Sequence, residues 1–351
     1  MTAVSMAANA SAVIDRRYSL LRRQNPFHNN HDAMTPPLSD HFNGKTFFYP
    51  GTGSGGRFRD FLRWRFNRRP APWPRWIELP RQPPPPAPCG DEIVATWIGH
   101  ATWLLQSAHG NFLTDPHFSP AAGPRGRIGP SRVHAPGVAF DALPRIDAVL
   151  LSHDHYDHCD LPSLRRLARA HAPLFVAPLR HGDLLARAGA RRVVELDWWQ
   201  SHTLDAGVQI TLTPSKHWTN RLDAPRNHRL WGGFMLTLGP RQLWFAGDTG
   251  YDADLFRTIG RRCGAPDLAL LPIGAYEPRW FMAPMHMNPA EAVATHRDTG
   301  ARRSLAMHWG TFQLTDEARA EPARALAAAR AEAGVADDAF RIISPGTSAV
   351  V

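Results

Sequence analysis

Three histidines and two aspartates lie within six consecutive residues, His153 to His158, one residue after the apolar run 149–151. In an extended segment alternate side chains face one side, so His153 and His155 share a side, and the next turn brings Asp157 and His158 to a second point. Imidazole and carboxylate groups without a thiolate suit zinc, manganese or iron, and paired groups suit two ions about 3.5–4 Å apart. The spacing therefore predicts a binuclear metal site. The alternative, a polar loop that is rich in histidine by chance, does not account for this spacing.

This H-x-H-x-D-H pattern after a hydrophobic strand resembles the metallo-β-lactamase superfamily. That superfamily has, further along the chain, a histidine, an aspartate and a last histidine, each after a strand. His217, Asp248 and His308 stand at those places, each at the end of a hydrophobic run; the alternative for each is a polar group of the core or surface. The resemblance implies an α/β fold, the αβ/βα four-layer sandwich of two facing mixed β-sheets with outer helices.

The resemblance also implies the metal ligands and their roles. One ion is held by His153, His155 and His217, the other by Asp157, His158 and His308, and Asp248 bridges the two. The cofactors expected are two divalent ions, zinc before manganese or iron, sharing a water whose pKa they lower towards neutrality. Asp157 and Asp248 thereby count as catalytic. True β-lactamases of this superfamily usually have cysteine in place of Asp248, which argues against β-lactams as substrates.

A more specific resemblance covers roughly residues 36–315. The stretch GAYEPRWFM at 274–282, followed by His286, resembles the corresponding sequence of the phospholipases D that hydrolyse N-acylphosphatidylethanolamine. It implies that water attacks a phosphodiester phosphorus and releases an N-acylethanolamine and phosphatidate. His286 is then a catalytic pocket histidine that contacts the phosphate, or else a structural histidine at a helix entry. The sequence departs from the family pattern at Asn288, where an acid is common. Further segments that carry the likeness are 97–102, 114–116, 217–218, 230–232 and 246–251.

Other polar and aromatic residues near these motifs each allow two interpretations. Asp115 and His100 either hydrogen-bond a metal-binding imidazole or shape a turn. Cys159 is expected to be a small buried residue rather than a reactive thiol. The aromatic residues either line an acyl or headgroup pocket or pack beneath the site; they are Tyr156, Trp218, Tyr276 and Trp280.

The elements that must position these residues begin after the proline-rich connector at 83–88. From Asp91 onward short β-like runs alternate with helical ones, which favours a layered α/β architecture. The predicted strands are 93–105, 111–114, 146–151, 174–177, 193–196, 208–213, 231–237, 242–246, 268–273 and 304–307. The predicted helices are 162–170, 182–188, 254–262, 289–299 and 321–333, the fourth of which has an N-cap residue, Asn288, and a stop, Gly300.

Charge divides the 351-residue chain further. Residues 1–90 hold 13 lysines and arginines against five acids, so they carry +8 of the net charge of +9. We expect a loosely ordered arm at 1–35, a basic aromatic extension at 36–90 that packs on the main domain, and a hydrolase domain at 91–351. Arginines and aromatics at 57–69 suit peripheral contact with anionic lipid, or else form a solvated basic segment whose aromatics pack inward. The glycines at 51–56 lack the residues of a phosphate loop.

Three widely spaced cysteines exclude a disulfide framework and fit a reducing compartment. The apolar stretch 3–14 is too short to span a bilayer and lacks the flank of a signal peptide, so the expected location is cytoplasmic, with peripheral membrane contact left open. Rival functions are a nuclease resembling ribonuclease Z, a sugar-lactone hydrolase and a metal-stabilised scaffold. The basic first quarter supports a nuclease, while the 274–282 stretch weighs against nucleic acid as partner. The oligomeric state stays open, a homodimer included.

Overall fold

The structure is a computed structural model that describes residues 38–51, 58–80, 82–205 and 207–351. The chain divides into two units, Met1–Thr35 and Pro36–Val351, and all described residues belong to the second. The predicted arm at 1–35, most of the glycine-rich segment and Arg57 lie outside the described residues. Within the described part, no helix is long and apolar enough to cross a membrane.

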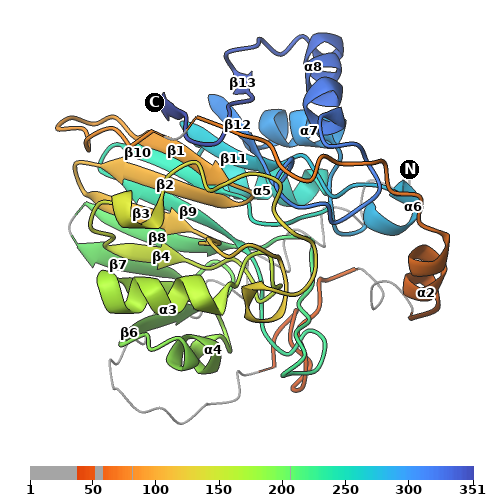
Figure 1. The fold of residues 1–351 in the computed structure, drawn as a ribbon. Helices are drawn as coiled ribbons and strands as arrows, with labels where there is room; N and C mark the ends of the chain where they lie inside the picture. The colour runs from red at the N-terminus through yellow and green to blue at the C-terminus, as the bar shows by residue number, and fades with distance from the viewer. Residues whose placement is uncertain (1–37, 52–57, 81, 206) are drawn as a thin grey trace, which may run out of the picture. The chain divides into compact units, whose positions relative to one another are not determined.

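The first of two seven-stranded sheets has the order β14-β1-β2-β3-β4-β5-β6 (Figure 1). Its strands from β14 to β3 pair antiparallel, and those from β3 to β6 pair parallel. The strands are β1 Val94–Gly99, β2 Thr102–Ser107, β3 Gly110–Thr114, β4 Ala148–Leu150, β5 Leu174–Pro178, β6 Arg192–Leu196 and β14 Ser348–Val350.

The second sheet repeats this plan in the other half of the chain, with the order β13-β12-β11-β10-β9-β8-β7. Strands β7 to β10 pair antiparallel and β10 to β13 pair parallel. The strands are β7 Ser201–Asp205, β8 Val208–Thr213, β9 Gly233–Leu238, β10 Arg241–Phe245, β11 Leu268–Pro272, β12 Arg303–Met307 and β13 Phe340–Arg341.

Three apolar layers hold these elements together. The inner faces of both sheets share one cluster of buried side chains, which includes Trp97, Trp103, Phe234 and Phe245. A second cluster joins the first sheet to the helices α3 and α4, and a third joins the second sheet to α5, α7 and α8 (Figure 1). Each fully buried side chain of this size contributes about 1.5–3 kcal/mol. The predicted αβ/βα four-layer sandwich is therefore confirmed. The helices are α3 Leu161–Ala170, α4 Gly182–Arg187, α5 Ala253–Cys263, α7 Pro289–Thr299 and α8 Glu321–Ala333.

The sequence signals at α7 act as predicted. Asn288 accepts a hydrogen bond from the Glu291 amide, and the Glu291 carboxylate accepts one from the Asn288 amide, so both form a capping box. Gly300 ends the helix in the left-handed region, at φ 70°, where glycine is favoured.

One predicted strand is wrong in its extent. Residues 93–105 form two antiparallel strands, β1 and β2, because the chain reverses at Gly99 and His100, whose φ angles are 136° and 53°. The predictions also missed the short edge strands β7, β13 and β14 and two helices, α2 (Phe58–Asn67) and α6 (Arg279–Met282). The edge strands lack the buried alternation that marks a strand in sequence.

The basic extension runs along the loop 313–317. The Ala71 amide donates to the Asp316 carbonyl, and the indole of Trp73 donates to the Glu317 carbonyl at 2.9 Å. The Arg68 guanidinium pairs with the Asp316 carboxylate at 3.0 Å. These contacts fix the segment that follows α2, whereas the predicted boundary at residues 90 and 91 stays a prediction.

Candidate metal centre

All predicted metal ligands follow the carboxyl ends of strands that point to one edge of the sandwich. The cluster 153–158 follows β4 in the first sheet. His217 follows β8, Asp248 follows β10 and His308 follows β12, all in the second sheet. Since β8, β10 and β12 run in the same direction, their ends deliver these residues to the same edge.

One half of the centre consists of three imidazoles. His155 Nδ1 lies 2.9 Å from His153 Nε2 and 3.3 Å from His217 Nε2. The ligand atoms of the three residues lie within 4.8 Å of one another. This is the set that the resemblance implies for the first ion.

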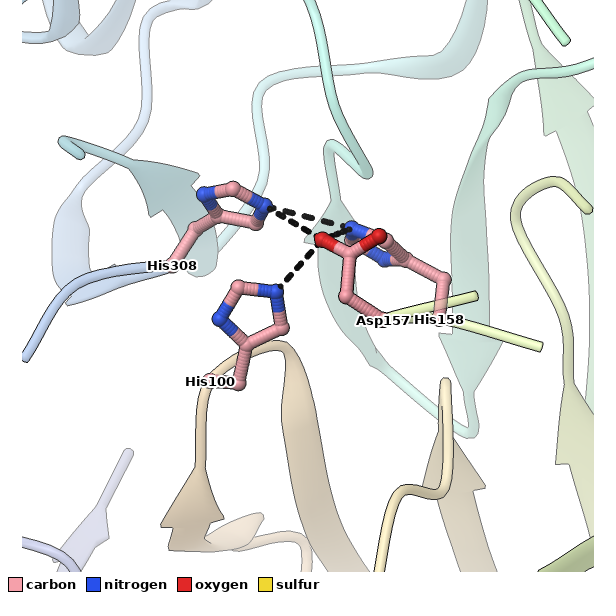
Figure 2. Close-up of side chains that lie close together, drawn as sticks. All are labelled: His100, Asp157, His158 and His308. Atoms are coloured by element: carbon pink, nitrogen blue, oxygen red, sulfur yellow. Dashed lines mark hydrogen bonds and ion pairs between the residues drawn. The ribbon is translucent and has the colours of Figure 1, made fainter. Parts of the chain in front are cut away.

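The other half combines a carboxylate with two imidazoles (Figure 2). Asp157 Oδ2 lies 3.3 Å from His158 Nε2 and 3.5 Å from His308 Nε2. The two imidazole nitrogens face each other at 3.2 Å. His100, from the turn between β1 and β2, joins this group by its Nε2, which lies 2.9 Å from Asp157 Oδ2.

Asp248 lies between the two halves. Its Oδ2 is 3.1 Å from His158 Nε2 and 3.8 Å from His217 Nε2, and its Oδ1 is 3.2 Å from His308 Nε2. His153 Nε2 lies 4.0 Å from Oδ2. The carboxylate therefore reaches ligand atoms of both sets, as a bridging group must.

The two halves of the centre differ in the protonation of their imidazoles. Burial holds the pKa of His153 and of His217 well below 6.5, so both rings are neutral, the form that binds metal. Burial raises the pKa of Asp248, but the neighbouring His158 and His308 outweigh it and hold that pKa well below its usual value. Asp248 Oδ1 is buried and accepts no hydrogen bond among the described residues, and its neighbour is the ring of His308 at 3.2 Å. Two neutral imidazoles and an ionised carboxylate are groups that bind a divalent ion. In the other half, burial lowers the pKa of His158 and His308, but Asp248 and Asp157 outweigh it, so the pKa of His158 lies well above 6.5 and that of His308 is raised to about 9. Both of these rings must lose a proton when an ion binds.

Hydrogen bonds behind the ligands fix which ring nitrogen faces the centre. His158 Nδ1 lies 2.6 Å from Asp115 Oδ2, and Asp115 also accepts from the amide and hydroxyl of Ser152. The His217 Nδ1–H donates to the carbonyl of Met285 at 2.9 Å. Asp115 thus contacts an imidazole, which is one of the two roles predicted for it. The residue follows β3 at the same edge of the sandwich.

His100 is held from two sides. Its carbonyl accepts hydrogen bonds from the amide of His308 and from the indole of Trp97. Its own amide donates to the hydroxyl of Thr311 at 2.9 Å. The residue therefore fixes the backbone of one candidate ligand and the carboxylate of another, Asp157.

A cavity of about 620 Å³ opens onto the centre. Asp157, Asp248, His155 and His286 line its polar end. His286 Nδ1 lies 3.9 Å from Asp248 Oδ2 and has no hydrogen-bond partner among the described residues, and burial lowers its pKa to about 4. The remaining walls are mainly apolar and aromatic, and include Phe61, Trp64, Tyr156, Trp218, Phe281, Met282, Met285 and Leu314.

Of the four aromatic residues predicted for the pocket, Tyr156 and Trp218 line this cavity. Tyr276 does not line it, because its ring is buried and its hydroxyl donates to Glu321. Trp280 does not line it either, since it is 49% exposed and lies beneath the guanidinium of Arg63. Cys159 is fully buried, and burial raises the pKa of its thiol to about 12, so it is the inert residue that was expected.

The sequence reading missed the contribution of α2 to this cavity. Phe61 and Trp64, one helical turn apart, both line it, and Trp64 stacks on Phe281 with ring centroids 5.3 Å apart. The mixture of aromatic residues and arginines at 57–69 was visible in the sequence, but this pattern does not predict which surface the aromatic side chains cover.

Comparison with known proteins agrees with this geometry. Residues 110–309 match the beta-lactamase superfamily domain. The chain is 38% identical over 240 residues to N-acyl-phosphatidylethanolamine-hydrolyzing phospholipase D 1 of Caenorhabditis elegans, covering 66% of this chain and 67% of that protein. It is 31% identical over 255 residues to a UPF0173 metal-dependent hydrolase of Opitutus terrae, covering 72% of this chain and 96% of that protein.

A solved structure shows the same fold. The metallo-beta-lactamase fold protein YhfI from Bacillus subtilis superposes with a TM-score of 0.53 at 18% identity, over 75% of this chain and 100% of that one. The sequence matches and the side-chain cluster confirm the resemblance read from the motifs. The chain belongs to the beta-lactamase superfamily and is a metal-dependent hydrolase of that family.

Proposed function

We propose that this protein is a phosphodiesterase of the phospholipase D type that cleaves N-acylphosphatidylethanolamine-like lipids to N-acylethanolamine and phosphatidate. The observation that carries the proposal is the cavity of about 620 Å³, polar at the candidate metal centre and apolar along Trp64, Phe281 and Met285. A phosphodiester with acyl chains matches both ends, whereas a sugar lactone needs a small polar pocket. The nematode relative carries the same activity in its name.

Two divalent ions, zinc before other metals, are proposed as the cofactor, and when bound they would supply an activated water and sites for phosphate oxygens. His153, His155 and His217 would hold one ion, Asp157, His158 and His308 the other, and Asp248 both. In hydrolysis a bond forms from the water oxygen to phosphorus, the bond from phosphorus to the ethanolamine oxygen breaks, and a water proton passes to that leaving oxygen. His286, at the polar end of the cavity, is placed to hydrogen-bond a phosphate oxygen.

We further propose that α2 brings the cavity to anionic membrane, within the segment 57–69 singled out by sequence. Phe66 is 80% exposed and Phe61 43% exposed, and Arg59, Arg63 and Arg65 lie on the same helix. Exposed aromatic rings beside arginines suit the interface of an anionic lipid surface. Because Phe61 also lines the cavity, the helix links the lipid surface to the metal centre.

The test is turnover on a lipid panel with one purified, metal-analysed sample. We expect N-acylethanolamine to be released from vesicles, and Asp248→Asn to lower that release by at least about 1,000-fold with loss of bound metal. Asp254→Asn is the matched control, because its carboxylate is 97% exposed and pairs with Arg257 rather than with a candidate ligand. Metal-loaded protein that cleaves RNA or lactones but no phospholipid would overturn the proposal in favour of the rival functions.

A further inference from the structure

A second cavity lies outside the metal centre, between the loop 119–132 and the start of α3. Its volume is about 600 Å³. Four of its ten lining residues are arginines, and no acidic side chain is among these described residues. We call it the arginine cavity; its arginines are Arg125, Arg127, Arg165 and Arg166.

The charge in the arginine cavity is only partly neutralised. Arg166 pairs with Asp141 at 3.2 Å, and Arg165 donates to the backbone carbonyl of Arg187. The guanidinium groups of Arg125 and Arg127 have no ion pair or hydrogen bond among the described residues. Arg125 and Arg127 are both exposed, so two cationic groups at this open cavity are solvated and available to a ligand.

The loop holds its arginines in a fixed turn. Arg125 has a left-handed backbone, with φ 60° and ψ 14°, and the next residue, Gly126, has φ 67°. A Cβ atom on Gly126 would lie 2.1 Å from the hydroxyl oxygen of Ser119, so only glycine fits there. The Ala121 amide donates to the Gly126 carbonyl at 3.0 Å, which closes the turn.

A buried arginine braces the same loop from below. Arg132 donates through Nε to the carbonyl of Ser119 and through Nη2 to the carbonyl of His117. Asp160, beneath the cavity, accepts a hydrogen bond from Ser163 and interacts electrostatically with Arg132. The Asp160 carboxylate is thus engaged by neighbouring side chains, and it lines a smaller adjoining cavity with Arg125 and Arg165 rather than the arginine cavity itself.

We propose that the arginine cavity is a phosphate-binding site separate from the metal centre. Several guanidinium groups around one hollow match the oxygens of a phosphate group, because each offers a planar fork of donors. Phe118 and Pro162, between the arginines, accept the carbon atoms of a phosphate ester. The phosphate belongs either to a lipid headgroup or to a free phosphate in solution; the exposed Ile128, beside Arg127, suits the first source.

The first experiment maps arginine modification by phenylglyoxal in the metal-loaded wild-type protein, by peptide mass spectrometry. We expect inorganic phosphate, against chloride at equal ionic strength, to slow the modification of Arg125 and Arg127 by about threefold or more. Arg191 and Arg324, which are exposed and line neither the arginine cavity nor the cavity at the metal centre, serve as internal controls, and their modification should not change. Equal protection of all four arginines, or of none, by phosphate and by vesicles alike would overturn the proposal.

Two vesicle arms identify the source of the phosphate: phosphatidylcholine alone, and phosphatidylcholine with phosphatidate. Protection by the phosphatidate vesicles but not by free phosphate assigns the site to a lipid headgroup, and the reverse assigns it to a soluble phosphate. Either result supports the proposal.

A pair of double variants tests the same site without chemical modification. The double variant Arg125→Gln/Arg127→Gln should bind inorganic phosphate or phosphatidate vesicles, whichever protects the wild type, with about tenfold lower affinity. The double variant Arg191→Gln/Arg324→Gln removes the same charge elsewhere and should keep the wild-type affinity. Neither pair touches the metal centre, so hydrolysis of a soluble diester should be unchanged in both. Equal binding by the two double variants would contradict the site and leave the proposed hydrolase activity intact.

Discussion

His158 and Asp115 lie 2.6 Å apart, from ring Nδ1 to carboxylate Oδ2, with both side chains fully buried. The bond fixes the ring so that Nε2 points to Asp248, 3.1 Å away. The orientation of a candidate metal ligand is therefore set by a residue that does not itself face the cavity.

Asp115→Asn should weaken metal binding by about 10- to 100-fold, because the amide cannot replace the charge that fixes His158. Competition with a chelator, read by metal analysis, measures the affinity. Asp141→Asn is the control, since that carboxylate is 91% exposed in the same half of the fold. Equal retention of metal by both variants would show that the Asp115 contact is structural only.

Trp64→Ala should raise the KM for a long-chain lipid by about tenfold while leaving the turnover of a short soluble diester within about twofold, because the side chain walls the cavity but does not reach the metal centre. Trp76→Ala, in the same extension but outside the cavity, should change neither value. The comparison uses steady-state kinetics on both substrates. Equal losses on both substrates would place Trp64 in the folding of the site rather than in lipid binding.

His41 predicts a pH dependence of stability. Burial lowers its pKa, but hydrogen bonds with Asp197 and Asp40 outweigh burial and raise it to about 9, above the 6.5 of an unfolded chain. Its contribution, at most about 3 kcal/mol, is fully present below pH 6.5 and is lost as the pH rises through 9. Urea unfolding at both ends of this range should show the loss in wild type and a smaller one in His41→Gln; identical pH profiles would contradict it.

Asn288→Ala should lower the free energy of unfolding by about 1 kcal/mol, since it removes the acceptor of the capping box at α7. Thermal unfolding with and without metal gives the value. Asn288→Asp, which keeps an acceptor and adds the negative charge preferred at a helix start, should remain near wild type. A loss as large in Asn288→Asp would show that the cap does not act through its acceptor.

Much of the fold follows from local signals. Helices α7 and α8 begin and end where the sequence predicts, because Asn288, Gly300 and the alanine-rich run 321–333 act over a few residues. The turn at Gly99 and His100 was missed, since buried residues on both sides read as one continuous strand. Short edge strands such as β13 depend on a partner strand far along the chain, which no local pattern specifies.

The candidate ligands were predictable in two steps. The spacing within 153–158 indicated a metal site, and the resemblance to the metallo-β-lactamase superfamily pointed to His217, Asp248 and His308. The structure brings them together because each follows a strand whose end lies at the same edge. The apolar walls were not predictable. Tyr276 lies in a site motif and Trp64 lies far from the motifs in sequence, yet tertiary packing places Trp64 in the cavity wall and Tyr276 outside it.

The helix α2 lies before residue 110, where the match to the family domain begins, whereas all seven candidate metal ligands lie within 110–309. The chain thus carries its candidate ligands and one part of the apolar wall, Phe61 and Trp64, on different stretches of sequence, while Phe281 and Met285 of the same wall lie inside the matched domain. Under the proposed lipid hydrolysis, exchanging 58–67 for the corresponding stretch of a relative should change the chain-length preference and leave the ligand set untouched.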